Sequence, residues 1–320
     1  MINMSDSNAS GLLYSIRPYI KLLRPEIADM DVALPAASAL LATYLSTGGF
    51  PELFHFIIAI TAAYIAITSS YVFNDYCDVD IDTINLPDRP LPSSQISKNN
   101  ALIFAVFLML IAGSVAFYLN PETLVVFIIA ASVITFYSAV AKRATYLSFI
   151  PVGISYGLVP IGVWLAFDPA GILKGNDGII LPIPAIFLGI MVCITDWGFT
   201  LSGVSRDVEG DRKKGAPTAP VTFGVPFISK FIFVCWFLGV AASLIIGYTA
   251  HLGPVFFIGA LAGGGWILWQ SADFIKHPLP ERGGELFLQG SRYRGILFGC
   301  LIIDVILLVL VPSIGYPFIW

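Results

Sequence analysis

Long apolar runs recur along the chain from residue 27 almost to its end, and short polar segments separate them. A helix that crosses a bilayer needs about 20 mostly apolar residues, because the hydrocarbon core is about 30 Å thick and each residue advances the helix by about 1.5 Å. Nine runs meet this requirement, so the pattern predicts nine transmembrane helices. The predicted spans are residues 27–47, 52–73, 101–119, 121–141, 147–167, 179–200, 226–249, 253–272 and 295–317.

The composition agrees with this pattern, because 57% of the residues are hydrophobic and only 12% are charged. Soluble domains contain about 25% charged residues. No polar half interrupts the apolar runs, so we expect one transmembrane domain over residues 27–320. Residues 1–26 form an N-terminal tail, in which the stretch IRPYIKLLRPE predicts a short amphipathic segment at the membrane interface. The expected class is an all-α integral membrane protein.

Basic residues divide unequally between the two sides of this predicted domain. If alternate loops are assigned to opposite sides, the side of the N-terminus receives all of the 17 Lys and Arg residues except Lys174. Basic loops resist translocation, so this imbalance indicates the sidedness of a multi-pass protein. We expect the N-terminus in the cytoplasm or on the equivalent side of an organelle membrane.

Two acidic clusters follow the second and sixth predicted spans, and both fall on the basic side. In the first cluster, helical spacing aligns an Asn and two Asp at i, i+4 and i+8, with a further Asp beside them; in the second, two Asp are four residues apart. The candidate metal ligands are Asn74, Asp75, Asp78, Asp82, Asp207 and Asp211. Like charges at this spacing repel, which indicates a bound cation. Oxygen ligands without His or Cys favour Mg²⁺.

A Mg²⁺ site with basic residues nearby, in front of an apolar interior, fits a substrate with a diphosphate head and a long hydrocarbon tail. An isoprenyl diphosphate has this form, and membrane lipid is the surrounding partner, whereas nucleic acid is not expected. The candidate diphosphate-binding residues are Arg89, Lys142, Arg143, Arg206 and Arg212. For several of them, the preference for basic residues on the cytoplasmic side is an equally good explanation.

The stretch NDYCDVDIDTINLPDRPLPSS contains the pattern NDxxDxxxD, followed by Asn85, Arg89-Pro90 and a Pro-Ser pair. The stretch DVEGDRKKGAPTAPVTFG contains DxxxD, and YSAVAKR lies after the fourth predicted span. Together these motifs resemble those of the UbiA superfamily of intramembrane prenyltransferases. The resemblance implies nine helices around a central cavity that two Asp-rich motifs cap from the cytoplasmic side. Within the superfamily, the motifs are similar to those of chlorophyll synthases and of the archaeal ether-lipid (geranylgeranylglyceryl phosphate geranylgeranyltransferase) branch, which implies geranylgeranyl diphosphate as the donor.

The expected reaction begins with Mg²⁺-assisted ionisation of the allylic diphosphate and ends with prenyl transfer to a lipophilic acceptor in the membrane. Aromatic faces stabilise the cation that forms. The candidate cation-lining residues are Tyr71, Tyr156 and Trp197, and the candidate catalytic residues are Tyr137 and Asp196. Asp196 lies eleven residues before Asp207 and could act as a base, guide the cation or only cap a break in the helix. Asp304 lacks an acidic partner, so a structural role is expected.

Two alternatives remain open at this stage. In a UbiA-type terpene cyclase, which here would be a diterpene synthase, geranylgeranyl diphosphate cyclises and no acceptor is needed. Val204 stands where many relatives have Asp or Asn, and Asp29 and Asp31 replace a usual Asn in the first span; both departures favour this outcome. A transporter would be expected to show inverted repeats with matched broken helices. The two acidic loops are only loosely alike, so the transporter is the weaker alternative.

Overall fold

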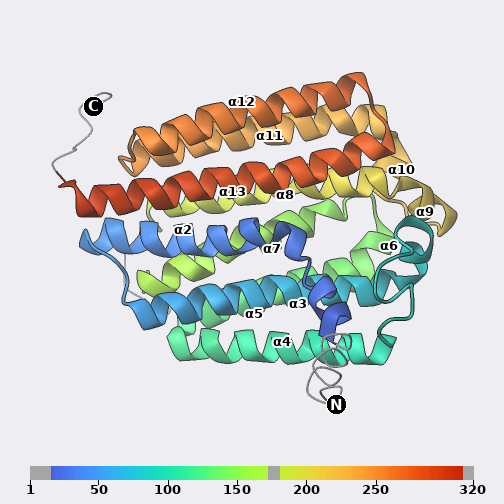
Figure 1. Ribbon diagram of the computed structural model, residues 1–320, viewed down its shortest axis with the longest axis horizontal. Coiled ribbons are helices and arrows are strands. Elements are labelled where there is room, and N and C mark those ends of the chain that lie inside the picture. The colour runs from blue at the N-terminus through green and yellow to red at the C-terminus, as the bar shows by residue number, and fades with distance from the viewer. Residues whose placement is uncertain (1–15, 172–180, 313–320) are drawn as a thin grey trace, which may run out of the picture.

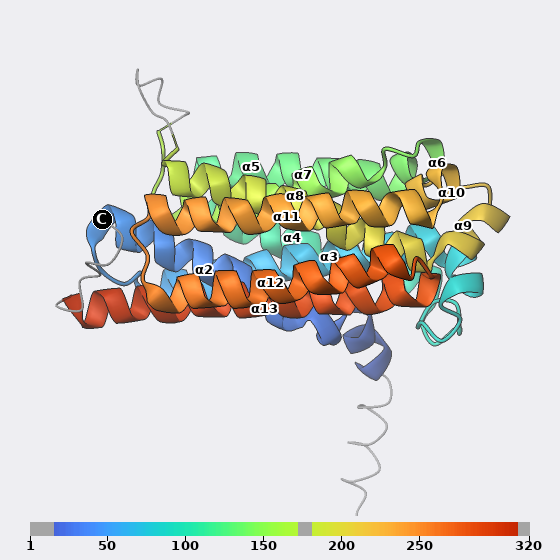
Figure 2. The same ribbon diagram turned by 90° about the horizontal axis from the view of Figure 1, so that it is seen from above.

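Long apolar helices lie side by side with nearly parallel axes in one bundle (Figures 1 and 2). The computed structural model describes residues 16–171 and 181–312, and these residues contain helices and connections but no strand. The long helices are α2 (Ala28–Thr47), α3 (Leu53–Asn85), α4 (Lys98–Leu119), α5 (Pro121–Phe136), α7 (Phe149–Phe167), α8 (Ile183–Arg206), α11 (Val225–Thr249), α12 (Pro254–Lys276) and α13 (Pro280–Leu310). The short ones are η1 (Pro25–Ile27), η2 (Tyr137–Ala141), α6 (Lys142–Ala144), α9 (Val208–Lys213) and α10 (Ala219–Phe223). This bundle confirms the predicted fold class.

Eight helices of the described ranges are long and apolar enough to cross a membrane. The helix α2 coincides with the first predicted span, but it carries Asp29 and Asp31 and is not one of these eight. The predicted number of nine spans therefore stays a prediction. Part of the predicted span 179–200 and the end of 295–317 lie outside the described residues, as do residues 1–15 of the tail.

Several helices extend well beyond the spans predicted from hydropathy. The helix α3 continues from residue 73 to Asn85, and α8 continues from residue 200 to Arg206. The helix α13 begins at Pro280, before the predicted last span of 295–317. Hydropathy marks only the apolar part of a helix, whereas backbone hydrogen bonds from residue i to residue i−4 continue through polar residues.

Polar side chains fix several helix ends. Ser97 accepts a hydrogen bond from the amide of Asn100 at the start of α4, and Asn120 accepts one from the amide of Thr123 at the start of α5. Such caps satisfy amides that have no partner within the helix. Asp304 of α13 accepts hydrogen bonds from the amides of Gly253 and Phe256 at the start of α12. Asp304 thus makes the structural contact that was expected of it.

The polar features gather at one end of the bundle. The C-terminal end of α3 and the short helices α6, α9 and α10 all lie at this end (Figure 1). Residues 16–22 are also helical and precede η1. The fold therefore brings the two acidic motifs, which lie more than a hundred residues apart in the sequence, to the same end.

Candidate active site

A cavity of about 530 Å³ opens at this end and reaches into the bundle. Its walls come from α3, η2, α7, α8 and α13, together with the segment before η1 and the connection after α3. Most of the predicted site residues line it. They are Tyr71, Asn74, Asp78, Asp82, Arg89, Tyr137, Lys142, Tyr156, Asp196, Arg206 and Asp207.

The acidic face of α3 has the predicted helical alignment. Because α3 continues without a break through the motif, Asn74, Asp78 and Asp82 all face the cavity, four residues apart. The side chains of Asp78 and Asp82 are buried, at 1% and 5% exposure. Buried carboxylates need positive partners, and each of these has one.

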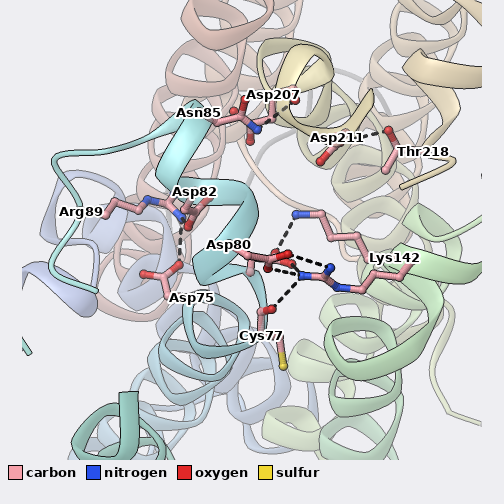
Figure 3. Close-up of polar contacts among 12 residues, drawn as sticks. Asp75, Cys77, Asp80, Asp82, Asn85, Arg89, Lys142, Asp207, Asp211 and Thr218 are labelled. Carbon is pink, nitrogen blue, oxygen red and sulfur yellow. Dashed lines mark hydrogen bonds and ion pairs between the residues drawn. The ribbon is translucent and has the colours of Figure 1, made fainter. Parts of the chain in front are cut away.

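Three basic residues neutralise the carboxylates of the cavity. Lys142 Nζ lies 2.6 Å from Asp78 Oδ2, and Arg206 Nε lies 2.7 Å from Asp207 Oδ1. Arg89 lies on the connection after α3 and turns back, so that its Nη1 contacts Asp82 Oδ2 at 2.8 Å (Figure 3). The cations predicted for the diphosphate thus stand directly beside the carboxylates predicted for the metal.

Asp75 faces a different direction from the other carboxylates of α3. Its Oδ1 accepts hydrogen bonds from Arg89 at 2.9 Å and from Arg24 at 2.8 Å, and it does not line the cavity. The predicted metal ligand Asp75 is therefore turned away from the cavity that Asp78 and Asp82 line, because it lies on another side of the helix from Asp78.

Arg24 is a cavity residue that sequence reasoning missed. Its guanidinium lies 4.5 Å from the centre of the Tyr71 ring, and it donates to Asp75. Arg24 has a left-handed backbone conformation (φ 52°), which separates residues 16–22 from η1. One signal for this break is the Arg24-Pro25 pair, because proline disfavours a helical conformation in the residue before it.

The residues present fit the predicted Mg²⁺, although no three carboxylate, His or Cys groups of the described residues are close enough to hold one ion together. The buried atoms without a hydrogen-bond partner include Asp78 Oδ1, Asp211 Oδ1 and the side-chain amide nitrogen of Asn74. An unsatisfied buried acceptor costs free energy. Mg²⁺ usually takes one or two carboxylates and completes its shell with water and substrate phosphate, so these free oxygens suit it.

Asn85 connects the two acidic motifs. Its side-chain amide donates to the carbonyl of Asp207 at 3.0 Å (Figure 3). Its side-chain oxygen accepts a hydrogen bond from the backbone amide of Gly210 at 2.9 Å. A Cβ atom at Gly210 would collide with the Asn85 side chain, so only glycine permits this approach. The last residue of α3 therefore holds the start of α9 in place.

Asp211 lies in α9 at the edge of the site and does not line the cavity. Its Oδ2 accepts a hydrogen bond from the hydroxyl of Thr218 at 3.0 Å. Burial raises the pKa of Asp211 to about 6, against the opposing effects of Lys142 and Thr218. Asp196 and Asp207 thus line the cavity, whereas Asp211 faces α10.

Asp196 forms a buried ion pair that the sequence did not reveal. Arg294 Nη1 of α13 lies 3.1 Å from Asp196 Oδ1, and the two side chains are 3% and 1% exposed. The hydropathy pattern predicts a polar loop at Arg294, because it starts the last span at residue 295. The second oxygen of Asp196 accepts from Thr200 at 3.2 Å. The carboxylate is therefore held rigidly in the wall of the cavity.

Besides Asp75 and Asp211, three further predicted residues do not line the cavity. Arg143 pairs with Asp80 at 2.6 Å, Arg212 is exposed on α9, and Trp197 donates to the carbonyl of Ile150. Trp197 thereby joins α8 to α7. We leave these three out of the proposed site, because their side chains are engaged elsewhere or face outward.

Tyrosines form the aromatic part of the cavity wall. The rings of Tyr71 and Tyr156 are stacked, with centres 6.5 Å apart. The Tyr71 hydroxyl donates to both oxygens of the buried Asp31, at 2.9 and 3.1 Å. Tyr137 lies in η2, a π-helical turn of the kind that often occurs at functional sites.

The helical bundle, its cavity and its acidic mouth define an intramembrane prenyltransferase. Residues 35–314 match the profile of the UbiA prenyltransferase family, and the chain belongs to this family. The resemblance seen in the motifs is confirmed.

Relatives in this family carry the name digeranylgeranylglyceryl phosphate synthase. The protein of Methanospirillum hungatei is 27% identical over 290 residues, covering 88% of this chain and 96% of that protein. The protein of Methanoregula boonei is 30% identical over 234 residues, covering 72% of this chain and 77% of its own length. These relatives give the terpene cyclase alternative no support.

Solved structures share the fold. A UbiA homolog from Aeropyrum pernix, solved in its apo form, has a TM-score of 0.69 at 19% identity and covers 87% of this chain and 97% of its own. A UbiA homolog from Archaeoglobus fulgidus, described as bound to DMAPP and Mg²⁺, has a TM-score of 0.55 at 16% identity, with 87% and 98% covered.

Proposed function

We propose that this protein transfers a geranylgeranyl group from its diphosphate to a lipophilic acceptor within the membrane, with Mg²⁺ as cofactor. One observation carries the proposal: a single cavity joins acidic and basic residues at its mouth to stacked tyrosines farther in. The names of the relatives favour a glycerol phosphate ether as the acceptor. A donor bound by the Archaeoglobus homolog, DMAPP, is an isoprenyl diphosphate of the same chemical class.

The diphosphate binds at the mouth, between α3 and the α8–α9 junction. Asp78 and Asp82 of α3 would hold one Mg²⁺, and Asp207 and Asp211 at the α8–α9 junction would hold a second. When bound, Mg²⁺ stabilises the charge that develops on the leaving diphosphate. Lys142, Arg89 and Arg206 stand beside these carboxylates and donate hydrogen bonds to diphosphate oxygens. Asn74 adds the amide that has no partner in the structure.

The C1–O bond to the diphosphate breaks, and the bonding electrons leave with the diphosphate. Tyr71, Tyr137 and Tyr156 surround the place where C1 becomes cationic and exclude water from it. An acceptor hydroxyl oxygen then bonds to C1 and loses its proton. Asp196 of α8 lines the cavity, and we assign the proton to its carboxylate.

We also infer that the mouth faces the cytoplasm or its organellar equivalent, and that residues 27–320 act as one domain. The uneven distribution of basic residues supports the sidedness. Cysteine labelling with a membrane-impermeant reagent on intact and inverted vesicles tests it. A single cysteine placed at Lys214, on the polar end, should react only where the cytoplasmic face is accessible.

The proposed function is tested with purified protein, geranylgeranyl diphosphate and geranylgeranylglyceryl phosphate. Mass spectrometry should show the acceptor carrying a second prenyl group when Mg²⁺ is present. Chelation of divalent ions by EDTA should stop product formation, and added Mg²⁺ should restore it. A cyclic hydrocarbon formed without acceptor, or the absence of any Mg²⁺-dependent turnover, would contradict the proposal.

The contact made by Asn85 leads to a further prediction. Asn85→Ala should raise the Mg²⁺ concentration needed for half-maximal activity by about 10- to 100-fold, because residues that position metal ligands have effects of this size. Excess Mg²⁺ should restore most of the rate. Thr83→Ala, an exposed change on the same helix turn, is the matched control and should leave the Mg²⁺ requirement unchanged. Loss of activity that Mg²⁺ cannot restore would mean that Asn85 does not act through the metal.

A further inference from the structure

A buried carboxylate of α2, that of Asp31, lies behind the aromatic part of the cavity wall. Asp31 is 2% exposed and does not line the cavity itself. The hydroxyl of Tyr71 donates to both of its oxygens, at 2.9 and 3.1 Å, and Tyr71 does line the cavity. A single tyrosine side chain therefore connects the Asp31 carboxylate to the cavity.

The charge of Asp31 is not cancelled by an ion pair within the described part of the chain. Asp196 differs in this respect, because it pairs with Arg294 at 3.1 Å. A buried carboxylate without a cation in contact costs free energy, and ionisable residues in membrane-spanning segments usually serve a function. Asp31 lies within the first predicted span, so its charge favours the presence of a positive charge close by.

A cation already lies against the ring that Asp31 holds. The guanidinium carbon of Arg24 lies 4.5 Å from the centre of the Tyr71 ring, and Arg24 lines the same cavity. The face of an aromatic ring attracts positive charge. This contact shows that the Tyr71 ring is accessible to a cation from the cavity.

We propose that Asp31 is a positioning residue for the ionisation step and that it acts through Tyr71. This inference rests on the proposed function and concerns how the allylic cation is stabilised. The carboxylate fixes the direction of the Tyr71 hydroxyl and, by accepting its hydrogen bond, increases the electron density of the ring. The ring then attracts the cation forming at C1 more strongly. No bond forms or breaks at Asp31, and the hydroxyl proton stays on Tyr71.

Asp31→Asn tests the role of the charge, because it keeps the shape of the side chain and one acceptor oxygen. The kcat for transfer from geranylgeranyl diphosphate should fall about tenfold, since part of the attraction between a desolvated cation and a ring is lost. The KM for the donor should stay within about twofold, because the lost interaction is made only in the transition state. Asp29→Asn is the matched control: Asp29 is exposed on the same helix, and its kcat should not change.

A double-variant cycle with Tyr71→Phe separates this role from a merely structural one. Tyr71→Phe keeps the ring, removes the hydroxyl and should lower kcat to a similar extent. In this background Asp31→Asn should change kcat by less than about twofold, because the hydrogen bond that couples the two residues is already absent. Thermal unfolding in detergent gives the folded fraction to which each rate is referred. If Asp31→Asn does not fold, the rate of Tyr71→Phe still tests the inference.

An unchanged kcat in folded Asp31→Asn or in Tyr71→Phe would overturn the inference. Equal falls in kcat in both backgrounds would also overturn it, because Asp31 would then act independently of Tyr71. A higher KM at unchanged kcat would instead assign Asp31 to donor binding. Failure of the proposed function gives a different result: the unchanged protein then transfers no isoprenyl group to geranylgeranylglyceryl phosphate, and the inference fails with it.

Discussion

Asp78→Asn is expected to lower the rate of prenyl transfer by about 10²- to 10³-fold, the usual effect of removing one group that stabilises a developing charge. Asp78 lies in the middle of the acidic row of α3, and its side chain is 1% exposed. One of its oxygens contacts Lys142, and the other accepts no hydrogen bond and lies 4.0 Å from Arg143 Nη2. The substitution removes a metal ligand and keeps the shape of the side chain. The measurement is initial rate at saturating Mg²⁺.

Asp80→Asn is the matched control. Asp80 is two residues away on the same helix, but its side chain is 45% exposed and pairs with Arg143 outside the cavity (Figure 3). This variant should keep its rate within about twofold, since surface ion pairs contribute little. The melting temperature of both variants should be recorded, because Lys142 loses its charged partner in Asp78→Asn. Equal rates for the two folded variants would show that Asp78 has no special role.

Asp196→Ala is expected to destabilise the protein by about 3–5 kcal/mol, because Arg294 would be left as an uncompensated buried charge. The two side chains are almost fully buried, and Arg294 also lies 4.9 Å from the centre of the Phe199 ring. The double variant Asp196→Leu and Arg294→Met should recover most of the loss, because it removes both charges and fills the space. Thermal unfolding in detergent measures the effect.

The control for this prediction is the ion pair of Asp273 with Arg282. Arg282 Nε lies 2.7 Å from Asp273 Oδ2, but the Asp273 side chain is 40% exposed. Asp273→Ala should cost no more than about 1 kcal/mol. The double variant at Asp196 and Arg294 also separates two roles of Asp196. If it is stable and inactive, Asp196 acts in the reaction; if it is stable and active, the ion pair serves the fold alone.

Much of the fold follows from local properties of the sequence. Hydropathy is a sum over neighbouring residues, and the bilayer selects helices of a set length, so the positions of most long helices could be predicted. The alignment of Asn74, Asp78 and Asp82 followed from the helical period alone, because α3 does not break. The motifs also identified the family, which the whole-chain match confirmed.

The pairing of charges could not be predicted in the same way. Asp75 has the same residue type and nearly the same position as Asp78, yet it turns toward Arg24 and Arg89. Arg294 looked like a loop residue because charge lowers the local hydropathy. It is buried because its partner Asp196, 98 residues earlier, neutralises it.

The sequence by itself determined the class of protein, the helices and the chemical types of the site residues, because these depend on residue type and on spacing within one helix. The tertiary structure decided which carboxylates share a cavity, that Asn85 joins the two acidic motifs, and that Arg294 is buried beside Asp196. These features depend on how side chains from different helices meet. That packing is fixed by shape and charge over the whole bundle, and no local pattern records it.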